Sequence, residues 1–377
     1  MFNFSSPNDA PKIIAIMGAT GQQGGAAVRA FHALKESGNN TFRLRAITRN
    51  PASENAQAIA PMVDEIVKAD ANDVTSMVEA FRGCHGAFLV SNWWEDLDVA
   101  HEITILRNLK EAVKKAGVKH IVNSVFEDSR DFVANADDKD TWTIIPTPNG
   151  GPTNMYVPHI DGKGQVGKEF EEEGLPVTSF FTSFYYENFI NLGMGPTRQS
   201  ESDPYAITLP ISDARMPMVA VDDMGKAICA IFQDESLIGK TVGIMSETLS
   251  GAEMAETFAK ICGQPVMYNA VPWNVFASFG FPGCGELANM FRFKVDFNET
   301  YTKTRVVSDE FDEKMGGRIK FEDWVVANKG AFVLESPKKE DDVAEKTLSE
   351  AKEKSEKPVQ YDDEDAPEVC CSQCNLM

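Results

Sequence analysis

The chain has 377 residues, enough for two domains, and its 43% hydrophobic and 25% charged residues are typical of a folded protein with a core. This composition excludes disorder over the whole length, as well as collagen-like and coiled-coil proteins. No apolar run reaches the ~18–20 residues of a membrane-spanning helix. The first twelve residues also lack the apolar stretch of a signal peptide. We therefore expect a cytoplasmic protein.

The 57 acidic residues outnumber the 36 basic ones and give a net charge of −21. A protein of this charge repels phosphate backbones, which argues against direct binding to nucleic acid but allows a local basic pocket for one phosphorylated cofactor. The five histidines show no HxxxH or HExxH spacing, so no metal site is expected.

Short β-branched runs alternate with helical patterns in the first half of the chain. Helices are expected at 23–36 and 98–116, and strands at 12–17, 42–47, 63–68, 86–90, 119–124 and 176–181. Alternation at this spacing predicts βαβ crossovers and a parallel sheet that is covered on both faces.

The second half of the chain is less regular. Residues 126–160 are polar and rich in Pro and Gly, which predicts a long surface loop, and a helix restarts near Asp161. Further helices are expected near 222–233, 251–262, 284–293 and 321–329. We predict an α/β fold, a Rossmann-type doubly wound parallel sheet with a smaller C-terminal α/β lobe. The domain would span 10–333, with 10–182 mainly the Rossmann core and 183–333 mainly the second lobe.

The C-terminal segment 334–377 is acidic and poor in large apolar residues, which predicts a flexible tail. It ends Cys374-Asn-Leu-Met377, a CaaX box of the farnesyl type, and Cys370 and Cys371 are candidates for palmitoylation beside it. Lipidation would anchor the protein to the cytosolic face of a membrane. The alternatives are exposed thiols on a flexible tail, or a metal clip with only three ligands.

A glycine-rich loop follows the first expected strand directly. It reads Gly18-Ala-Thr-Gly21-Gln-Gln-Gly24 and opens a helix. Glycines permit the tight turn, and they let backbone N–H groups approach a pyrophosphate at the positive end of the helix. Because the loop lies between a strand and a helix, it predicts a dinucleotide site.

The end of the second strand indicates which dinucleotide would bind. NAD-binding chains usually carry Asp or Glu there, for the ribose 2′-OH. This strand ends Thr48-Arg49-Asn50, and a guanidinium fork suits a 2′-phosphate instead. NADP(H) is therefore predicted in preference to NAD(H), the alternative being a solvated arginine at a strand end.

Two further loops leave the same edge of the predicted sheet. Asp70 ends the third strand and could accept from the adenine amino group or cap the next helix, for which Asp73 is the better candidate. Ser91-Asn92-Trp93 ends the fourth strand, where the ribose and nicotinamide half of a dinucleotide would run.

Six motifs occur in order: GATGQQG, TRNP, FLVSNWWE, HIDGKG, YYENF and FPGCGELANMFRF. They resemble the NmrA-like family of atypical short-chain dehydrogenase relatives over residues 10–333, most closely the HSCARG-type NADP(H) sensors. The resemblance implies cofactor contacts from Gly18, Ala19, Thr20, Gly21, Gln22, Gln23, Arg49, Asn50, Ser53, Asp70, Ala71, Ser91, Asn92, Trp93, Lys163, Tyr185, Tyr186, Glu187 and Asn188. Thr104 replaces a cofactor-contacting lysine of the family sensor, and the loop between Ser124 and Lys163 looks longer than in the family.

Classical short-chain dehydrogenases use a serine and a YxxxK pair, in which the lysine helps the tyrosine to pass a proton. Ser124 and Lys163 occupy two of these positions and are the candidate catalytic residues, but His159 stands where the tyrosine would be. We expect His159 before the N-cap of the next helix, in a surface loop, and Tyr156 is also off-register. The first hypothesis is therefore a redox sensor that controls a protein partner or a homodimer. The alternative is an NADPH-dependent reductase of quinones or carbonyls.

Overall fold

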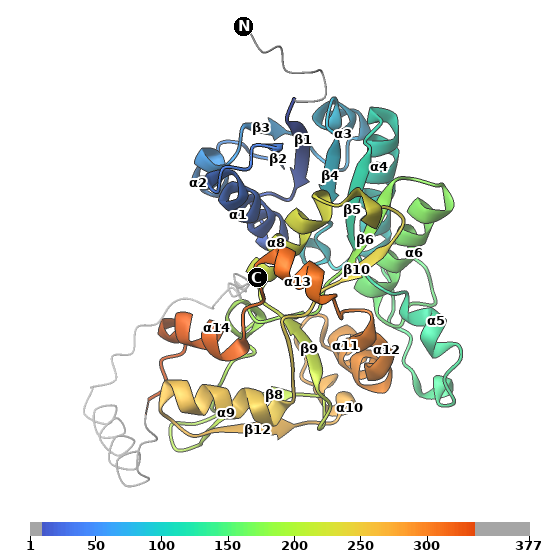
Figure 1. Cartoon of the computed structure of the whole chain (residues 1–377). Coiled ribbons are helices and arrows are strands. Elements are labelled where there is room, and N and C mark those ends of the chain that lie inside the picture. Colours follow the sequence, from blue (N-terminus) through green and yellow to red (C-terminus); the bar gives the residue numbers. More distant parts are fainter. Residues whose placement is uncertain (1–9, 336–377) are drawn as a thin grey trace, which may run out of the picture.

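A seven-stranded parallel sheet forms the centre of the protein (Figure 1). The computed structural model describes residues 10–335. Along the sheet the strands are β10 (Thr241–Gly243), β6 (Val177–Phe181), β5 (His120–Val125), β4 (Gly86–Leu89), β1 (Lys12–Met17), β2 (Phe42–Thr48) and β3 (Glu65–Lys68). Every neighbouring pair is parallel. The order reverses at β1, as in a Rossmann-type doubly wound sheet, so the predicted fold class is confirmed.

Helices cover both faces of the sheet because its central strands are apolar on both sides. Ile14 and Ile16 of β1 belong to the core beneath α1 (Gln22–Glu36) and α8 (Val221–Phe232). Ala15, which points to the opposite face, belongs to a second core. That core lies under α3 (Val74–Phe81), α4 (Val99–Ala116) and α6 (Pro158–Glu172). The six predicted strands are all present, with ends within two residues of the prediction.

Two elements from the second half of the chain return to this sheet layer. α8 packs along α1, and β10 pairs with β6 at the edge of the sheet. Gly225 of α8 allows the close approach, because a Cβ there would lie 2.2 Å from the backbone oxygen of Ala26. β10 was not predicted, since three residues carry too little pattern.

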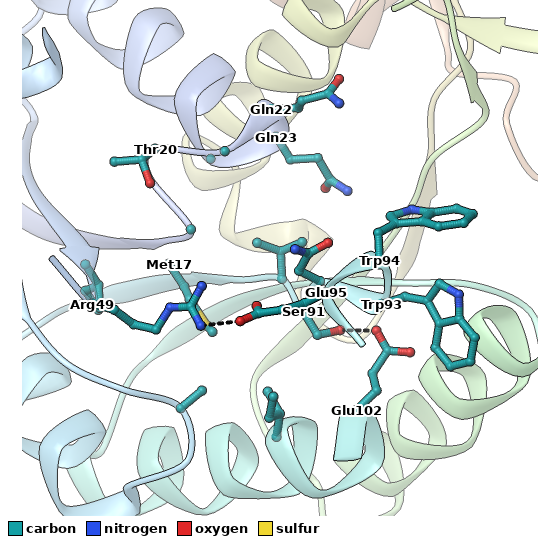
Figure 2. A pocket seen from close by; sticks show the side chains of 18 of the residues that line it. Met17, Thr20, Gln22, Gln23, Arg49, Ser91, Trp93, Trp94, Glu95 and Glu102 are labelled. Carbon is teal, nitrogen blue, oxygen red and sulfur yellow. Dashed lines mark hydrogen bonds and ion pairs between the residues drawn. The ribbon is translucent and has the colours of Figure 1, made fainter. Parts of the chain in front are cut away.

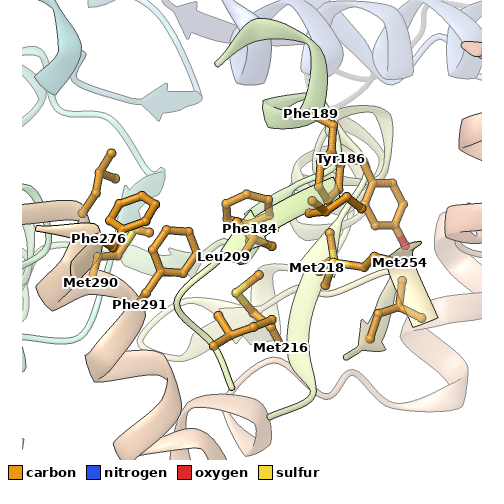
Figure 3. Close-up of a cluster of buried hydrophobic side chains, with 14 of the residues drawn as sticks. Phe184, Tyr186, Phe189, Leu209, Met216, Met218, Met254, Phe276, Met290 and Phe291 are labelled. Carbon is orange, nitrogen blue, oxygen red and sulfur yellow. The ribbon is translucent and has the colours of Figure 1, made fainter. Parts of the chain in front are cut away.

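Most of the remaining elements form a smaller lobe around an aromatic and methionine-rich core (Figure 3). Its strands are β7 (Phe184–Tyr185), β9 (Met216–Val219) and β11 (Glu247–Leu249) in one sheet, and β8 (Tyr205–Leu209) and β12 (Val266–Ala270) in another. Its longer helices are α9 (Gly251–Cys262) and α11 (Cys284–Asp296). The shorter helices of the chain are α2 (Glu54–Ile59), α5 (Ser129–Val133), α7 (Asn188–Asn191), α10 (Trp273–Phe276), α12 (Asn298–Lys303), α13 (Asp309–Met315) and α14 (Phe321–Ala327).

The prediction of a surface loop over 126–160 holds for residues 134–157, which are mostly irregular and exposed, but it is wrong at both ends. This segment contains α5 and the first turn of α6, and Val133, Trp142 and Met155 are buried. α6 begins at Pro158, because proline suits a first helical position where its missing N–H is not needed. The buried Asp161 carboxylate then fastens the segment by accepting from the backbone N–H groups of Ser129, Tyr156 and Val157.

Several sequence predictions fall beyond the part that the structure describes. Lipidation at Cys370, Cys371 and Cys374, and the acidic tail from residue 336 onward, lie outside the described residues. Within 10–335, no helix has the length and apolar character needed to cross a membrane.

Candidate functional site

A cavity of about 520 Å³ opens at the carboxyl ends of β1, β2, β3 and β4 (Figure 2). This edge is where open α/β sheets bind ligands, beside the strand at which the order reverses. Fifteen predicted residues line it: Gly18, Thr20, Gly21, Gln22, Gln23, Gly24, Arg49, Asp70, Ala71, Ser91, Asn92, Trp93, Lys163, Tyr185 and Asn188. The lining also includes residues that were not predicted: Met17, Ile47, Thr48, Ala69, Asn72, Met77, Val90, Trp94, Glu95, Asp96, His101, Glu102, Ile105 and Leu192.

The glycine loop presents the N-terminus of α1 to this cavity. Gly18 adopts φ +60°, which favours glycine, and a Cβ at Gly24 would lie 2.2 Å from the Gly18 carbonyl oxygen. The N-cap residue is Gly21, which has no side chain to cap the helix. The first-turn N–H groups can therefore receive a pyrophosphate, so the loop fits the predicted cofactor. Ala19 is buried and does not line the cavity.

Arg49 reaches the cavity from the end of β2. Its Nη1 lies 2.5 Å from Oε1 of Glu95, and this carboxylate raises the pKa of the guanidinium further. The side chains of the neighbouring predicted residues, Asn50 and Ser53, form hydrogen bonds with nearby backbone groups instead. Asn50 accepts from the N–H of Ala52, and Ser53 is the N-cap of α2. Neither residue lines the cavity.

The loops after β3 and β4 are joined by one histidine that was not predicted. Oδ1 of Asp70 accepts from the backbone N–H and the side-chain amide of Asn72, at 2.9 and 3.0 Å. The backbone hydrogen bond is the largest of the effects that hold the pKa of this carboxyl below its usual value. Asn72 Oδ1 in turn contacts Nε2 of His101, whose Nδ1 is paired with Asp96. Asp73 is the N-cap of α3, as the sequence favoured.

A buried ion pair lies at the other end of the cavity. Nζ of Lys163 is 3.1 Å from Oε1 of Glu102, and the same oxygen accepts from the Ser91 hydroxyl at 2.8 Å. Glu102 belongs to α4 and is buried. The sequence gives no sign that this carboxylate points inward, because an acidic residue on a helix is usually solvated. Its second oxygen, Oε2, has no hydrogen-bond partner among the described residues.

Ser124 reaches the cavity only through Gln23. The Ser124 hydroxyl donates to Oε1 of Gln23 at 2.8 Å, and Nε2 of Gln23 donates to the Tyr185 hydroxyl at 2.7 Å. Burial raises the pKa of the Tyr185 phenol. Gln23 and Tyr185 line the cavity, but Ser124 does not.

Tyr186 and Glu187 face the core of the second lobe. The ring of Tyr186 packs against those of Phe321 and Trp324, and it lies among the side chains in Figure 3. The Glu187 carboxylate accepts from the backbone N–H of Val221 and from the Trp324 indole, both at 3.1 Å. Neither lines the cavity.

The prediction that His159 lies in a surface loop is wrong. It stands in the first turn of α6, four residues before Lys163, and only 7% of it is exposed. Its Nδ1 is paired with Glu286 of α11, and its ring lies 5.9 Å from that of Trp94. The sequence gave no sign of Glu286, which lies 127 residues away. His159 does not line the cavity.

Fold and site together define a Rossmann-type α/β protein with a cavity suited to a dinucleotide. The model of the NmrA-like family matches residues 10–143 and 148–325, so the chain belongs to this family. The NmrA-like family domain-containing oxidoreductase malD of Malbranchea aurantiaca is 31% identical over 272 residues, which cover 68% of this chain and 75% of malD.

Two solved structures share the fold at lower identity. One is NmrA, a negative transcriptional regulator, in complex with NAD, with a TM-score of 0.66 and 21% identity. The similarity covers 86% of this chain and 98% of NmrA. The other is the NADPH-dependent quinone oxidoreductase QOR2 of Escherichia coli in complex with NADPH, with a TM-score of 0.59 and 21% identity. It covers 84% of this chain and 99% of QOR2.

Proposed function

We propose that the cavity binds NADP(H). The open N-terminus of α1 suits the pyrophosphate, and the guanidinium of Arg49 at the end of β2 suits the 2′-phosphate. NmrA has also been solved with NADP, and QOR2 with NADPH, which supports the same ligand here. Asp70 and Ala71 would meet the adenine, whereas Ser91, Asn92, Trp93 and Lys163 would lie along the nicotinamide ribose.

We further propose that the chain is a redox sensor of the HSCARG type, which binds the cofactor without turning over a substrate. The observation that carries this proposal is how the side chains at the three positions of the classical catalytic set are held. His159 is paired with Glu286 and lies outside the cavity lining, and the Ser124 hydroxyl donates to Gln23. Lys163 is held by Glu102. The bound nicotinamide would supply hydride chemistry, but His159 and Ser124 both lie outside the cavity lining, so neither is placed to give a proton to a substrate beside it.

A sensor must pass its state to something else. We propose a protein partner, or a second copy of the chain, whose binding depends on the redox form of the cofactor. The second lobe supports this proposal because Tyr185 and Asn188 of the cavity adjoin Tyr186 and Glu187 of that lobe's core.

An NADPH-dependent oxidoreductase is the second candidate function. One observation favours it: His159 lies one helical turn before Lys163, in the place of the usual tyrosine, and a histidine is a competent acid near neutral pH. Relatives such as malD and FrzB are named oxidoreductases. His159 would then have to reach the substrate from behind Trp93 and Trp94.

A single-turnover experiment separates the two functions. The protein is mixed with NADPH and a panel of quinones and aldehydes, and the loss of NADPH absorbance is followed beside calorimetric titration of the cofactor. The sensor proposal predicts binding of NADPH and no oxidation with any acceptor. Oxidation that is lost in His159→Phe, while NADPH still binds, would establish the reductase instead.

A further inference from the structure

The guanidinium that is proposed to bind the 2′-phosphate already has an acidic partner. Figure 2 shows Arg49 and Glu95 meeting across the cavity, with Nη1 and Oε1 2.5 Å apart. Both residues line the cavity, and both come from loops at the carboxyl ends of strands. A carboxylate and a phosphate present similar oxygens to a guanidinium fork, so one can stand in for the other.

We propose that Glu95 is a specificity-determining residue, whose carboxylate occupies the place of the cofactor's 2′-phosphate and competes with it for Arg49. This inference rests on the proposed binding of NADP(H). A dinucleotide with a 2′-phosphate must release Glu95 from Arg49 before it gains that contact. NAD(H) has no such phosphate, and it can bind while the pair stays closed. Glu95 therefore lowers the ratio of NADP(H) affinity to NAD(H) affinity that Arg49 would otherwise give.

The two cations of the cavity differ in how easily their partners can be exchanged. The side chains of Lys163 and Glu102 are only 10% and 3% exposed, so separating them would leave a buried charge without a partner. The side chains of Arg49 and Glu95 are 63% and 49% exposed. Water can solvate each of them once they separate, which makes this pair the exchangeable one.

Of the two neighbouring acidic residues Glu95 and Asp96, only Glu95 contacts Arg49. It ends the short 3-10 turn Trp93–Glu95, and the next residue, Asp96, is paired with His101. Asp96 also lines the cavity, so it carries the same charge in nearly the same place but contacts His101 and not Arg49. Asp96→Asn is therefore a matched control for the loss of one negative charge.

The test is a calorimetric titration of the full chain with NADPH, NADH and adenosine 2′,5′-bisphosphate. An exposed ion pair contributes about 0.2–1 kcal/mol, so Glu95→Gln is expected to tighten NADPH and the bisphosphate by a factor of about 1.5 to 5. NADH affinity should stay unchanged. In Asp96→Asn, NADPH and NADH should change by the same factor. In an Arg49→Gln background, Glu95→Gln should lose its effect on NADPH, because the competition needs both partners.

Three results would overturn the inference while leaving the proposed NADP(H) site intact. They are NADPH binding that Glu95→Gln leaves unchanged, NADPH binding that it weakens, and equal tightening of NADPH and NADH. If the wild-type chain binds neither dinucleotide, the proposed function and this inference both fall.

Discussion

The two ends of the cavity are built in different ways. The adenosine end, named for the half of the dinucleotide that we propose it holds, consists of Arg49, Asp70 and Glu95 on exposed loops. The nicotinamide end consists of Glu102, Lys163 and Tyr185, which belong to α4, α6 and β7. At the first end, backbone groups and half-exposed side chains provide the contacts. At the second end, buried or part-buried side chains from different elements hold one another, so binding and folding depend on the same contacts.

The largest expected effect is the loss of folding stability when the ion pair of the nicotinamide end is broken. Lys163→Ala should lower the free energy of unfolding by about 3–5 kcal/mol, because it leaves the Glu102 carboxylate buried without its cation. Urea denaturation would measure this loss. The double variant Lys163→Met, Glu102→Gln should recover most of it, and Arg49→Ala should cost less than about 1 kcal/mol. If Lys163→Ala and Arg49→Ala lowered the free energy of unfolding by similar amounts, the two ends of the cavity would not differ as we describe.

The adenosine end should instead govern the choice of cofactor. Arg49→Glu should weaken NADPH binding by about 1.5–3 kcal/mol, roughly 10- to 150-fold, because it replaces a charge-assisted pair with repulsion. NADH should lose far less. Arg43→Glu is the matched control, since Arg43 lies exposed on the same strand and outside the cavity lining. Equal losses for NADPH and NADH, measured by calorimetry, would show that Arg49 is not the discriminating residue.

A smaller effect is expected at the hydrogen bond between Gln23 and Tyr185. Tyr185→Phe removes the acceptor of the Gln23 amide and should weaken NADPH and NADH alike, by about 0.5–1.5 kcal/mol. Tyr186→Phe should leave both affinities unchanged, because its hydroxyl lies 3.5 Å from the Ile319 oxygen in the second lobe. If Tyr186→Phe lowered the affinity for the dinucleotides more than Tyr185→Phe does, our assignment of Tyr185 to the nicotinamide end would be wrong.

The smallest effect is a pH dependence confined to the adenosine end. Glu95 raises the pKa of Arg49, and hydrogen bonds from Asn72 lower that of Asp70, so both groups stay charged between pH 5 and 8. A phosphate monoester takes up a proton near pH 6 and loses part of its charge. The ratio of NADPH to NADH affinity should therefore fall by a factor of about two to five from pH 7.5 to pH 5. A ratio that rises on acidification would contradict a 2′-phosphate bound at Arg49.

The same contrast explains which parts of the site could be predicted from the sequence. The glycine loop, Arg49 and Asp70 follow strands directly, so their place at the sheet edge follows from the βαβ pattern. Glu102 and Glu286 gave no such signal, because a carboxylate on a helix is usually solvated and its partners are 61 and 127 residues away. The prediction for His159 is wrong because it starts the helix near Asp161, whereas Pro158 is the first helical residue. Tyr186 and Glu187 were grouped with Tyr185 by the motif, although β7 ends at Tyr185 and the chain then turns into the second lobe.

The most direct test of the central claim is the binding of NADPH and NADH to the wild-type chain, titrated side by side at neutral pH and low salt. Our account predicts one site per chain and an affinity for NADPH that is at least about tenfold higher, because Arg49 gains a charge-assisted bond only with the 2′-phosphate. Equal affinities, or no binding of either dinucleotide, would contradict it.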